Sequence, residues 1–147
     1  MEIERKFLLN TIPTDLYDYP CHTIEQGYLC TNPVVRIRKE DDTYYLTYKG
    51  KGKMAREEYN LPLTAESYAH LREKIDGRLI TKVRYLVPIL DGLTAEVDVF
   101  SSPQVGLHLA EVEFESIEAA NGFVPPEWFG EDVTEDGRYH NSFMSGL

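Results

Sequence analysis

Residues 2–7 read Glu2-Ile3-Glu4-Arg5-Lys6-Phe7, so that charged side chains at even positions alternate with the apolar Ile3 and Phe7. In a β-strand, residues i and i+2 point to the same face, which would place Glu2, Glu4 and Lys6 together on one side. The same period of two recurs in residues 35–38, 45–49, 82–85, 95–99 and 110–115, and residues 56–61 form a further candidate strand. The alternation predicts a chain that is mostly antiparallel β.

The polar faces of these strands are sorted by the sign of their charge. The same-sign neighbours are Glu2 with Glu4, Arg36 with Arg38, Lys82 with Arg84, Glu96 with Asp98, and Glu111 with Glu113 and Glu115. Like charges side by side reduce stability, and ordinary surfaces intersperse the two signs. The sorting therefore indicates a functional surface. The opposite faces carry Ile3, Phe7, Ile37, Val83, Tyr85, Val97, Val112 and Phe114, which must be buried elsewhere.

A closed barrel accommodates both faces, with the charged set lining the interior and the apolar set lying under helices and loops. We therefore predict a mainly β (α+β) fold: an eight-stranded antiparallel barrel with a few flanking helices, in one domain over residues 1–147. One amphipathic helix is predicted from a cap at Thr64 to Gly77, with shorter helices near Pro13 and Arg138. Turns are expected at Asp41-Asp42 and Asp91-Gly92.

Composition excludes several classes of function. The 147 residues include 15 Lys and Arg against 25 Asp and Glu, a net charge of −10, which disfavours nucleic acid as a partner. The longest apolar stretch, residues 86–90, is too short to span a membrane, and no apolar signal core follows the N-terminus. Two cysteines form no disulfide framework, and the four histidines are isolated from one another. We expect a cytoplasmic protein.

The predicted barrel interior would combine two kinds of site. Six cations would make an anion site: Lys6, Arg36, Arg38, Lys49, Lys82 and Arg84. Six carboxylates would suit a hard divalent cation, which prefers oxygen ligands: Glu2, Glu4, Glu96, Asp98, Glu111 and Glu113. A polyphosphate bridged by Mg²⁺ or Mn²⁺ satisfies both halves.

The chain resembles the CYTH superfamily, the triphosphate tunnel metalloenzymes. Glu2-Ile3-Glu4-Arg5-Lys6 matches the ExExK signature of that superfamily. The other motifs follow in the same order over nearly the whole chain: residues 35–38, 47–50, 56–58, 82–85, 96–98, 110–113 and the closing Arg138-Tyr139-His140-Asn141.

The resemblance implies a role for each matching residue. The cations named above would bind the triphosphate, with Arg56, Glu58 and Arg138 as accessory groups. Glu2, Glu4, Glu111 and Glu113 would hold Mg²⁺ or Mn²⁺, with Asp98 and Glu96 nearby. Catalysis would involve Glu2, Glu4 and Lys6, and either Glu2 or Glu4 would position the attacking water. The four metal-holding glutamates would repel one another without metal, so Glu111→Gln is predicted to leave the metal-free protein as stable as the wild type, or more stable.

The function implied by the resemblance is the metal-dependent hydrolysis of inorganic triphosphate, with nucleoside triphosphates as further substrates. Two other enzyme activities remain open, those of a class IV-type adenylate cyclase and of a thiamine triphosphatase. A non-catalytic polyphosphate- or nucleotide-binding protein is the alternative outside enzymes. The expected partner is a small triphosphate, and the protein would be a monomer or homodimer that binds neither nucleic acid nor membranes.

Overall fold

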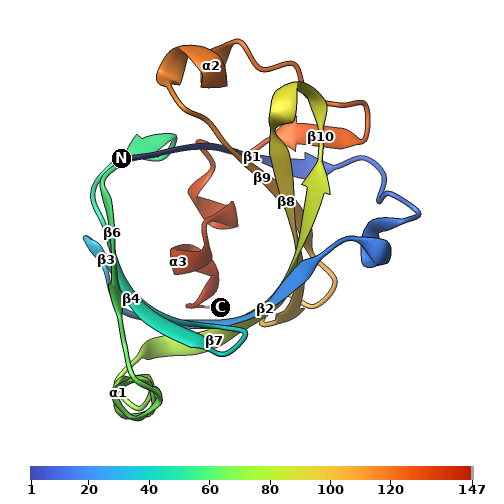
Figure 1. Cartoon of the computed structure of the whole chain (residues 1–147). Coiled ribbons are helices and arrows are strands. Elements are labelled where there is room, and N and C mark those ends of the chain that lie inside the picture. The colour runs from blue at the N-terminus through green and yellow to red at the C-terminus, as the bar shows by residue number, and fades with distance from the viewer. Residues whose placement is uncertain (147) are drawn as a thin grey trace.

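Ten strands join in one antiparallel sheet that curls into a nearly closed barrel (Figure 1). The computed structural model describes residues 1–146. The strands are β1 (Glu2–Leu9), β2 (Cys21–Thr31), β3 (Val34–Glu40), β4 (Thr43–Lys49), β5 (Ala55–Arg56), β6 (Glu58–Pro62), β7 (Asp76–Pro88), β8 (Thr94–Ser102), β9 (His108–Glu113) and β10 (Phe129–Asp132). The helices are η1 (Leu16–Asp18), α1 (Ala65–Arg72), η2 (Leu90–Gly92), α2 (Ile117–Asn121), η3 (Gly137–Tyr139) and α3 (Asn141–Met144). No helix in this part of the chain is long and apolar enough to cross a membrane.

The order of the strands, β10-β1-β9-β8-β7-β2-β3-β4-β6, confirms the predicted antiparallel barrel and corrects the number of strands from eight to ten. The candidate strand at residues 56–61 is interrupted at Glu57, which leaves β5 on β1 and β6 on β4. The short β10 pairs with the end of β1, where no strand was expected. Counting β5 and β6 as one interrupted strand, eight strands make the wall of the barrel and β10 lies beside it.

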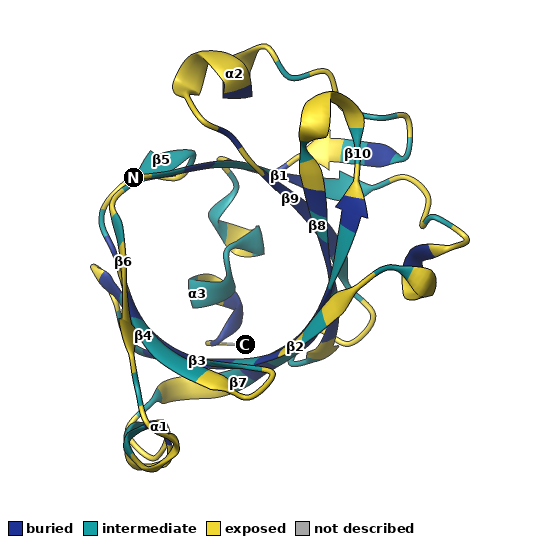
Figure 2. Cartoon of the chain, in the orientation of Figure 1, coloured by how far each residue is buried: buried dark blue, intermediate teal, exposed yellow. Residues whose placement is uncertain are grey.

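The apolar side of β1, β8 and β9 packs outside the barrel. Phe7, Val97 and Val112 lie in one core cluster with Ala120 of α2 and with Phe129 of β10. Figure 2 shows β9 as mostly buried, whereas α1 and α2 are largely exposed. Burying the apolar face of the wall under α2 and its loops leaves the charged face of the same strands to line the interior.

The predicted helix begins as expected but ends early. The side-chain oxygen of Thr64 accepts a hydrogen bond from the backbone N–H of Ser67 at 3.0 Å, which caps α1. The helix ends at Arg72, and Gly77 lies instead in β7 with a φ of +69°. Ile75 packs so closely over Gly27 of β2 that a Cβ there would lie 2.7 Å from it. This tertiary contact draws residues 73–77 out of the helix and towards the sheet.

Candidate functional site

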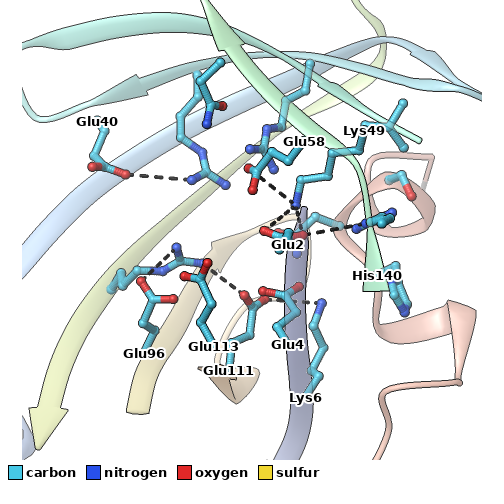
Figure 3. A pocket seen from close by; sticks show the side chains of 18 of the residues that line it. Glu2, Glu4, Lys6, Glu40, Lys49, Glu58, Glu96, Glu111, Glu113 and His140 are labelled. Carbon is cyan, nitrogen blue, oxygen red and sulfur yellow. Dashed lines mark hydrogen bonds and ion pairs between the residues drawn. The ribbon is translucent and has the colours of Figure 1, made fainter. Parts of the chain in front are cut away.

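The barrel encloses a cavity of about 320 Å³ that is lined almost entirely by charged and polar groups. Its lining includes seven acidic and seven basic residues, many of whose side chains point toward one another in Figure 3. They are Glu2, Glu4, Glu40, Glu58, Glu96, Glu111 and Glu113, with Lys6, Arg36, Arg38, Lys49, Arg56, Lys82 and Arg84. Thirteen of the fifteen residues that the sequence analysis names for the site lie in this lining, and the other two are Asp98 and Arg138.

The pairing of the strands explains why these side chains meet. On β1 and β9, Glu4 lies opposite Glu113, and Lys6 lies opposite Glu111. Partners in an antiparallel pair project to the same face of the sheet, so both pairs reach the interior together. The other strands add their inward residues by the same alternation.

The basic side of the cavity contains a cation that lacks a counter-charge. Arg36 is 5% exposed, and no carboxylate of residues 1–146 lies within ion-pair distance of it. Its Nη2 donates to Thr47 Oγ1 at 3.4 Å, while its Nε is buried without a partner in this part of the chain. Burial, together with the charges of Arg36 and Arg84, lowers the pKa of Arg38. Crowded, desolvated cations of this kind indicate a place where an anion binds.

Asp98, which the sequence placed among the metal ligands, does not line the cavity. Its side chain is 1% exposed and is covered inside the barrel by Lys82 and Arg84: its oxygens accept from Lys82 Nζ at 2.7 Å and from Arg84 Nε and Nη2 at 2.8 and 2.9 Å. Although burial favours the neutral form, Arg84 and Lys82 hold the pKa of Asp98 below its usual value. Burial also lowers the pKa of Lys82 to about 7, although Asp98 opposes that shift. Asp98 therefore positions two cations.

The acidic residues are mostly paired with cations. Glu2 Oε1 lies 3.0 Å from Lys49 Nζ and 3.7 Å from Arg56 Nε. Glu111 lies 3.3 Å from Lys6 Nζ and 3.5 Å from Arg84 Nη2.

The ion pairs of Glu111 with Lys6 and Arg84 contradict the prediction that its charge destabilises the metal-free protein. Burial disfavours its charge, yet Lys6 and Arg84 hold the pKa of Glu111 well below its ordinary value. Removing the charge of Glu111 would leave these buried cations less well compensated, so we now expect Glu111→Gln to lower the stability of the metal-free protein.

Glu4 is the crowded carboxylate of the site. Burial, and then the charges of Glu111 and Glu2, raise the pKa of Glu4 to about 8. Among residues 1–146, no three histidine, cysteine or carboxylate side chains already stand together as a ready ion-binding group. The donor set nevertheless fits a hard divalent cation, because carboxylate oxygens are its preferred ligands and its charge would relieve the repulsion at Glu4.

This crowding predicts a pH-dependent stability. Between its ordinary pKa of 4.5 and its folded value of about 8, Glu4 keeps its proton in the folded protein and loses it in the unfolded chain. Unfolding thus releases a proton, and the stability of the metal-free protein falls as the pH rises through this window. We expect Glu4→Gln to weaken this fall when the free energy of unfolding is measured by urea titration at about pH 5 and about pH 8. Glu115→Gln, at an exposed position, is the matched control. An unchanged pH dependence in Glu4→Gln would contradict the assignment.

Arg138 is not brought to the cavity. Its side chain is 72% exposed and its Nη2 pairs with Asp136 Oδ2 at 2.6 Å on the outer surface. The last two residues of the same motif, His140 and Asn141, lie in the cavity lining instead. Arg138 lies in a short 3₁₀ helix, Gly137–Tyr139, so its side chain points away from those of His140 and Asn141. The spacing of residues in the sequence could not reveal this turn.

Several lining residues were missed. Glu40 stands two positions after Arg38, so the period-two rule already contained the signal for it. Asn60, Tyr45 and Ser142 are uncharged and carried no signal in a search for sorted charges. His140, one of the four histidines that are isolated in the sequence, also lies in the lining. Burial and Lys6 lower its pKa, and its Nε2 lies 2.9 Å from the backbone oxygen of Thr134.

Comparison with known proteins gives consistent matches. The model of the CYTH domain matches residues 1–124. An inorganic triphosphatase of Nitrosomonas europaea is 40% identical over 98% of this chain and 96% of its own length, and one from Acetivibrio thermocellus is 34% identical over 96% and 90%. The solved structure of an inorganic triphosphatase superposes with a TM-score of 0.73 at 37% identity, covering 100% of this chain and 95% of the other.

Proposed function

The chain belongs to the CYTH domain family, and from that premise we propose that it hydrolyses inorganic triphosphate inside the barrel with the help of Mg²⁺ or Mn²⁺. The proposal takes its substrate from the two inorganic triphosphatases that the chain resembles over nearly their whole length.

One observation carries the proposal from this chain's own residues. Although the protein has a net charge of −10, seven of its 15 lysines and arginines line one cavity, and Arg36 there has no carboxylate partner in residues 1–146. Buried cations are stable only when an opposite charge faces them. A small polyanion supplies that charge in a cavity too small and enclosed for a macromolecule.

The acidic wall supports a role for a divalent cation. Glu4, Glu111 and Glu113, with Glu2 and Glu96 nearby, offer the carboxylate oxygens that would hold Mg²⁺ or Mn²⁺. A bound divalent cation would offset the negative charge that develops on the transferred phosphoryl group.

The residues of the chain itself would bind and orient the substrate. Arg36, Arg38 and Lys82 would bind phosphoryl oxygens on the basic side, where they stabilise charge that develops during phosphoryl transfer. Asp98 holds Lys82 in place through a 2.7 Å contact, so that little reorganisation is needed when substrate binds. Glu2 or Glu4 would position the attacking water by accepting its hydrogen bond.

Product identification tests the proposal. The pure protein is incubated with Mg²⁺ or Mn²⁺ and with tripolyphosphate, ATP or thiamine triphosphate in turn. We expect orthophosphate and pyrophosphate from tripolyphosphate at the highest rate. Formation of cyclic AMP and pyrophosphate from ATP would support an adenylate cyclase instead. Preferential cleavage of thiamine triphosphate would support a thiamine triphosphatase. Tight binding without any turnover would indicate a polyphosphate-binding protein.

The metal requirement gives a second prediction. Excess EDTA is expected to abolish phosphate release, and addition of Mg²⁺ or Mn²⁺ beyond the chelator is expected to restore it, because the acidic wall would otherwise repel the substrate. Circular dichroism of the chelated protein serves as the control that it remains folded. Full activity in EDTA would remove the metal from the proposal.

The cytoplasmic location and the monomeric or homodimeric state stay predictions. A free small triphosphate as the partner follows from the proposed activity, and binding to nucleic acid or membranes is not expected from the acidic exterior.

A further inference from the structure

On five of its strands, the interior of the barrel changes from charged to apolar within two residues, whereas on β4 the Lys49 opposite Val34 keeps the lining charged. On each of the five strands, the residue two positions beyond a member of the charged network belongs to a buried apolar cluster or, for Leu8, packs against it. The steps are Lys6 to Leu8 on β1, Arg36 to Val34 on β3, Lys82 to Ile80 on β7, Asp98 to Phe100 on β8, and Glu111 to Leu109 on β9. Because residues two apart share a face, this apolar cluster borders the cavity at Tyr28 and Val34 and fills the interior beyond it along these five strands.

The C-terminal segment completes this closure. Figure 1 shows α3 inside the ring of strands, and Met144 of α3, 1% exposed, packs in the same apolar cluster. Two hydrogen bonds hold the segment against the wall. Lys6 Nζ donates to the backbone oxygen of Tyr139 at 3.1 Å, and the backbone N–H of Arg78 donates to the backbone oxygen of Ser145 at 2.7 Å. A charged phosphate chain cannot pass through an apolar, close-packed plug without losing its hydration.

Asn141, the first residue of α3, lies where the apolar cluster and the C-terminal segment meet the cavity. Its Oδ1 accepts from Lys82 Nζ at 3.1 Å and from Gln26 Nε2 at 3.2 Å, while Gln26 Oε1 accepts from Arg38 Nε at 2.9 Å. These donors determine the orientation of the Asn141 amide, since only an oxygen can accept from both. Asn141 lines the cavity, and no hydrogen bond within residues 1–146 uses its Nδ2. Its two N–H groups are therefore available to a ligand.

We infer that the cavity is a blind pocket whose inner end is Asn141, and that the Asn141 amide binds the terminal phosphoryl group of the ligand. A polyphosphate then enters end-first and needs one terminal phosphate that carries no ester. The choice of a polyphosphate rests on the proposed function, whereas the blind end rests on the packing of the C-terminal segment.

Esterified ligands test the blind end in the wild-type protein. The probe is imidotriphosphate, a non-hydrolysable triphosphate, in the presence of Mg²⁺, together with its monomethyl ester and the dimethyl ester that caps both terminal phosphates. By isothermal titration calorimetry, we expect the monomethyl ester to bind within about threefold of the parent and the dimethyl ester to bind about tenfold or more weakly, since a hydrogen bond to a charged group is lost. Equal affinity of the two esters would overturn the inference.

A variant tests the residue. Asn141→Asp keeps an oxygen to accept from Lys82 and Gln26 but replaces the free N–H groups by negative charge. We expect the affinity for imidotriphosphate to fall about tenfold or more without a lower melting temperature. Asn121→Asp makes the same chemical change on α2, away from the cavity, and should bind as the wild type does. A folded Asn141→Asp protein with wild-type affinity would show that Asn141 does not touch the ligand.

The two proposals fail separately. Wild-type protein that binds the monomethyl but not the dimethyl ester, yet releases no phosphate from tripolyphosphate, would overturn the proposed hydrolysis and support the blind pocket. Wild-type protein that hydrolyses tripolyphosphate and binds both esters with equal affinity would support the proposed hydrolysis and overturn the blind pocket. Should Asn141→Asp not fold, the ester comparison decides the question alone.

Discussion

Arg36→Ala is expected to lower kcat/KM for tripolyphosphate on the order of 10²-fold, the effect of removing one preorganised group that stabilises developing charge. The expectation rests on the isolation of Arg36, whose buried guanidinium faces the cavity and has no ion-pair partner in residues 1–146. Because the substitution breaks no ion pair, we expect the free energy of unfolding to stay near the wild-type value or to rise.

Steady-state kinetics and a urea titration of the same preparation measure both quantities. Arg36→Lys keeps the charge but not the forked donor geometry, and should lie between the wild type and Arg36→Ala. Arg78→Ala removes an exposed arginine of β7 and controls for the loss of net charge. Near wild-type kinetics in Arg36→Ala would remove Arg36 from the anion site, and a large loss of stability would show a structural role instead.

Asp98→Asn is expected to lower the free energy of unfolding of the metal-free protein by about 3 to 5 kcal/mol, as found when one partner of a buried ion pair is removed. The amide keeps the shape of the side chain but leaves Lys82 and Arg84 without the carboxylate that accepts three of their hydrogen bonds. Turnover should fall as well, since both cations line the cavity.

The sign of the stability change separates the two roles considered for Asp98. A metal ligand in an acidic cluster would repel its neighbours, so its removal would leave the metal-free protein equally stable or more so. A residue that positions buried cations gives the opposite sign. Urea unfolding in EDTA makes the measurement, with Asp42→Asn in the exposed β3–β4 turn as the matched control. Unchanged or increased stability in Asp98→Asn would restore the metal-ligand assignment.

Sequence alternation predicted the face of the wall strands well because it depends only on local geometry. The period of two in β1, β3, β7 and β9 correctly separated the interior side chains from those on the outer face of the wall. It performed less well on β2, where Gln26 and Gly27 interrupt any clear pattern, and on the short β10, whose four residues are too few to show one. The helix ended early because Ile75 packs over Gly27, a contact between residues far apart in the chain.

The sequence by itself thus determined which charges share a face and, through the period of two, that those charges gather inside a barrel. Only the tertiary structure decided how they pair, because ion pairing depends on distances and burial across strands that are remote in sequence. It left Glu4 crowded, placed Glu111 between two cations, and put Asp98 behind Lys82 and Arg84. It also turned Arg138 outward and Asn141 inward within one short motif, because the chain turns between them to enter the barrel.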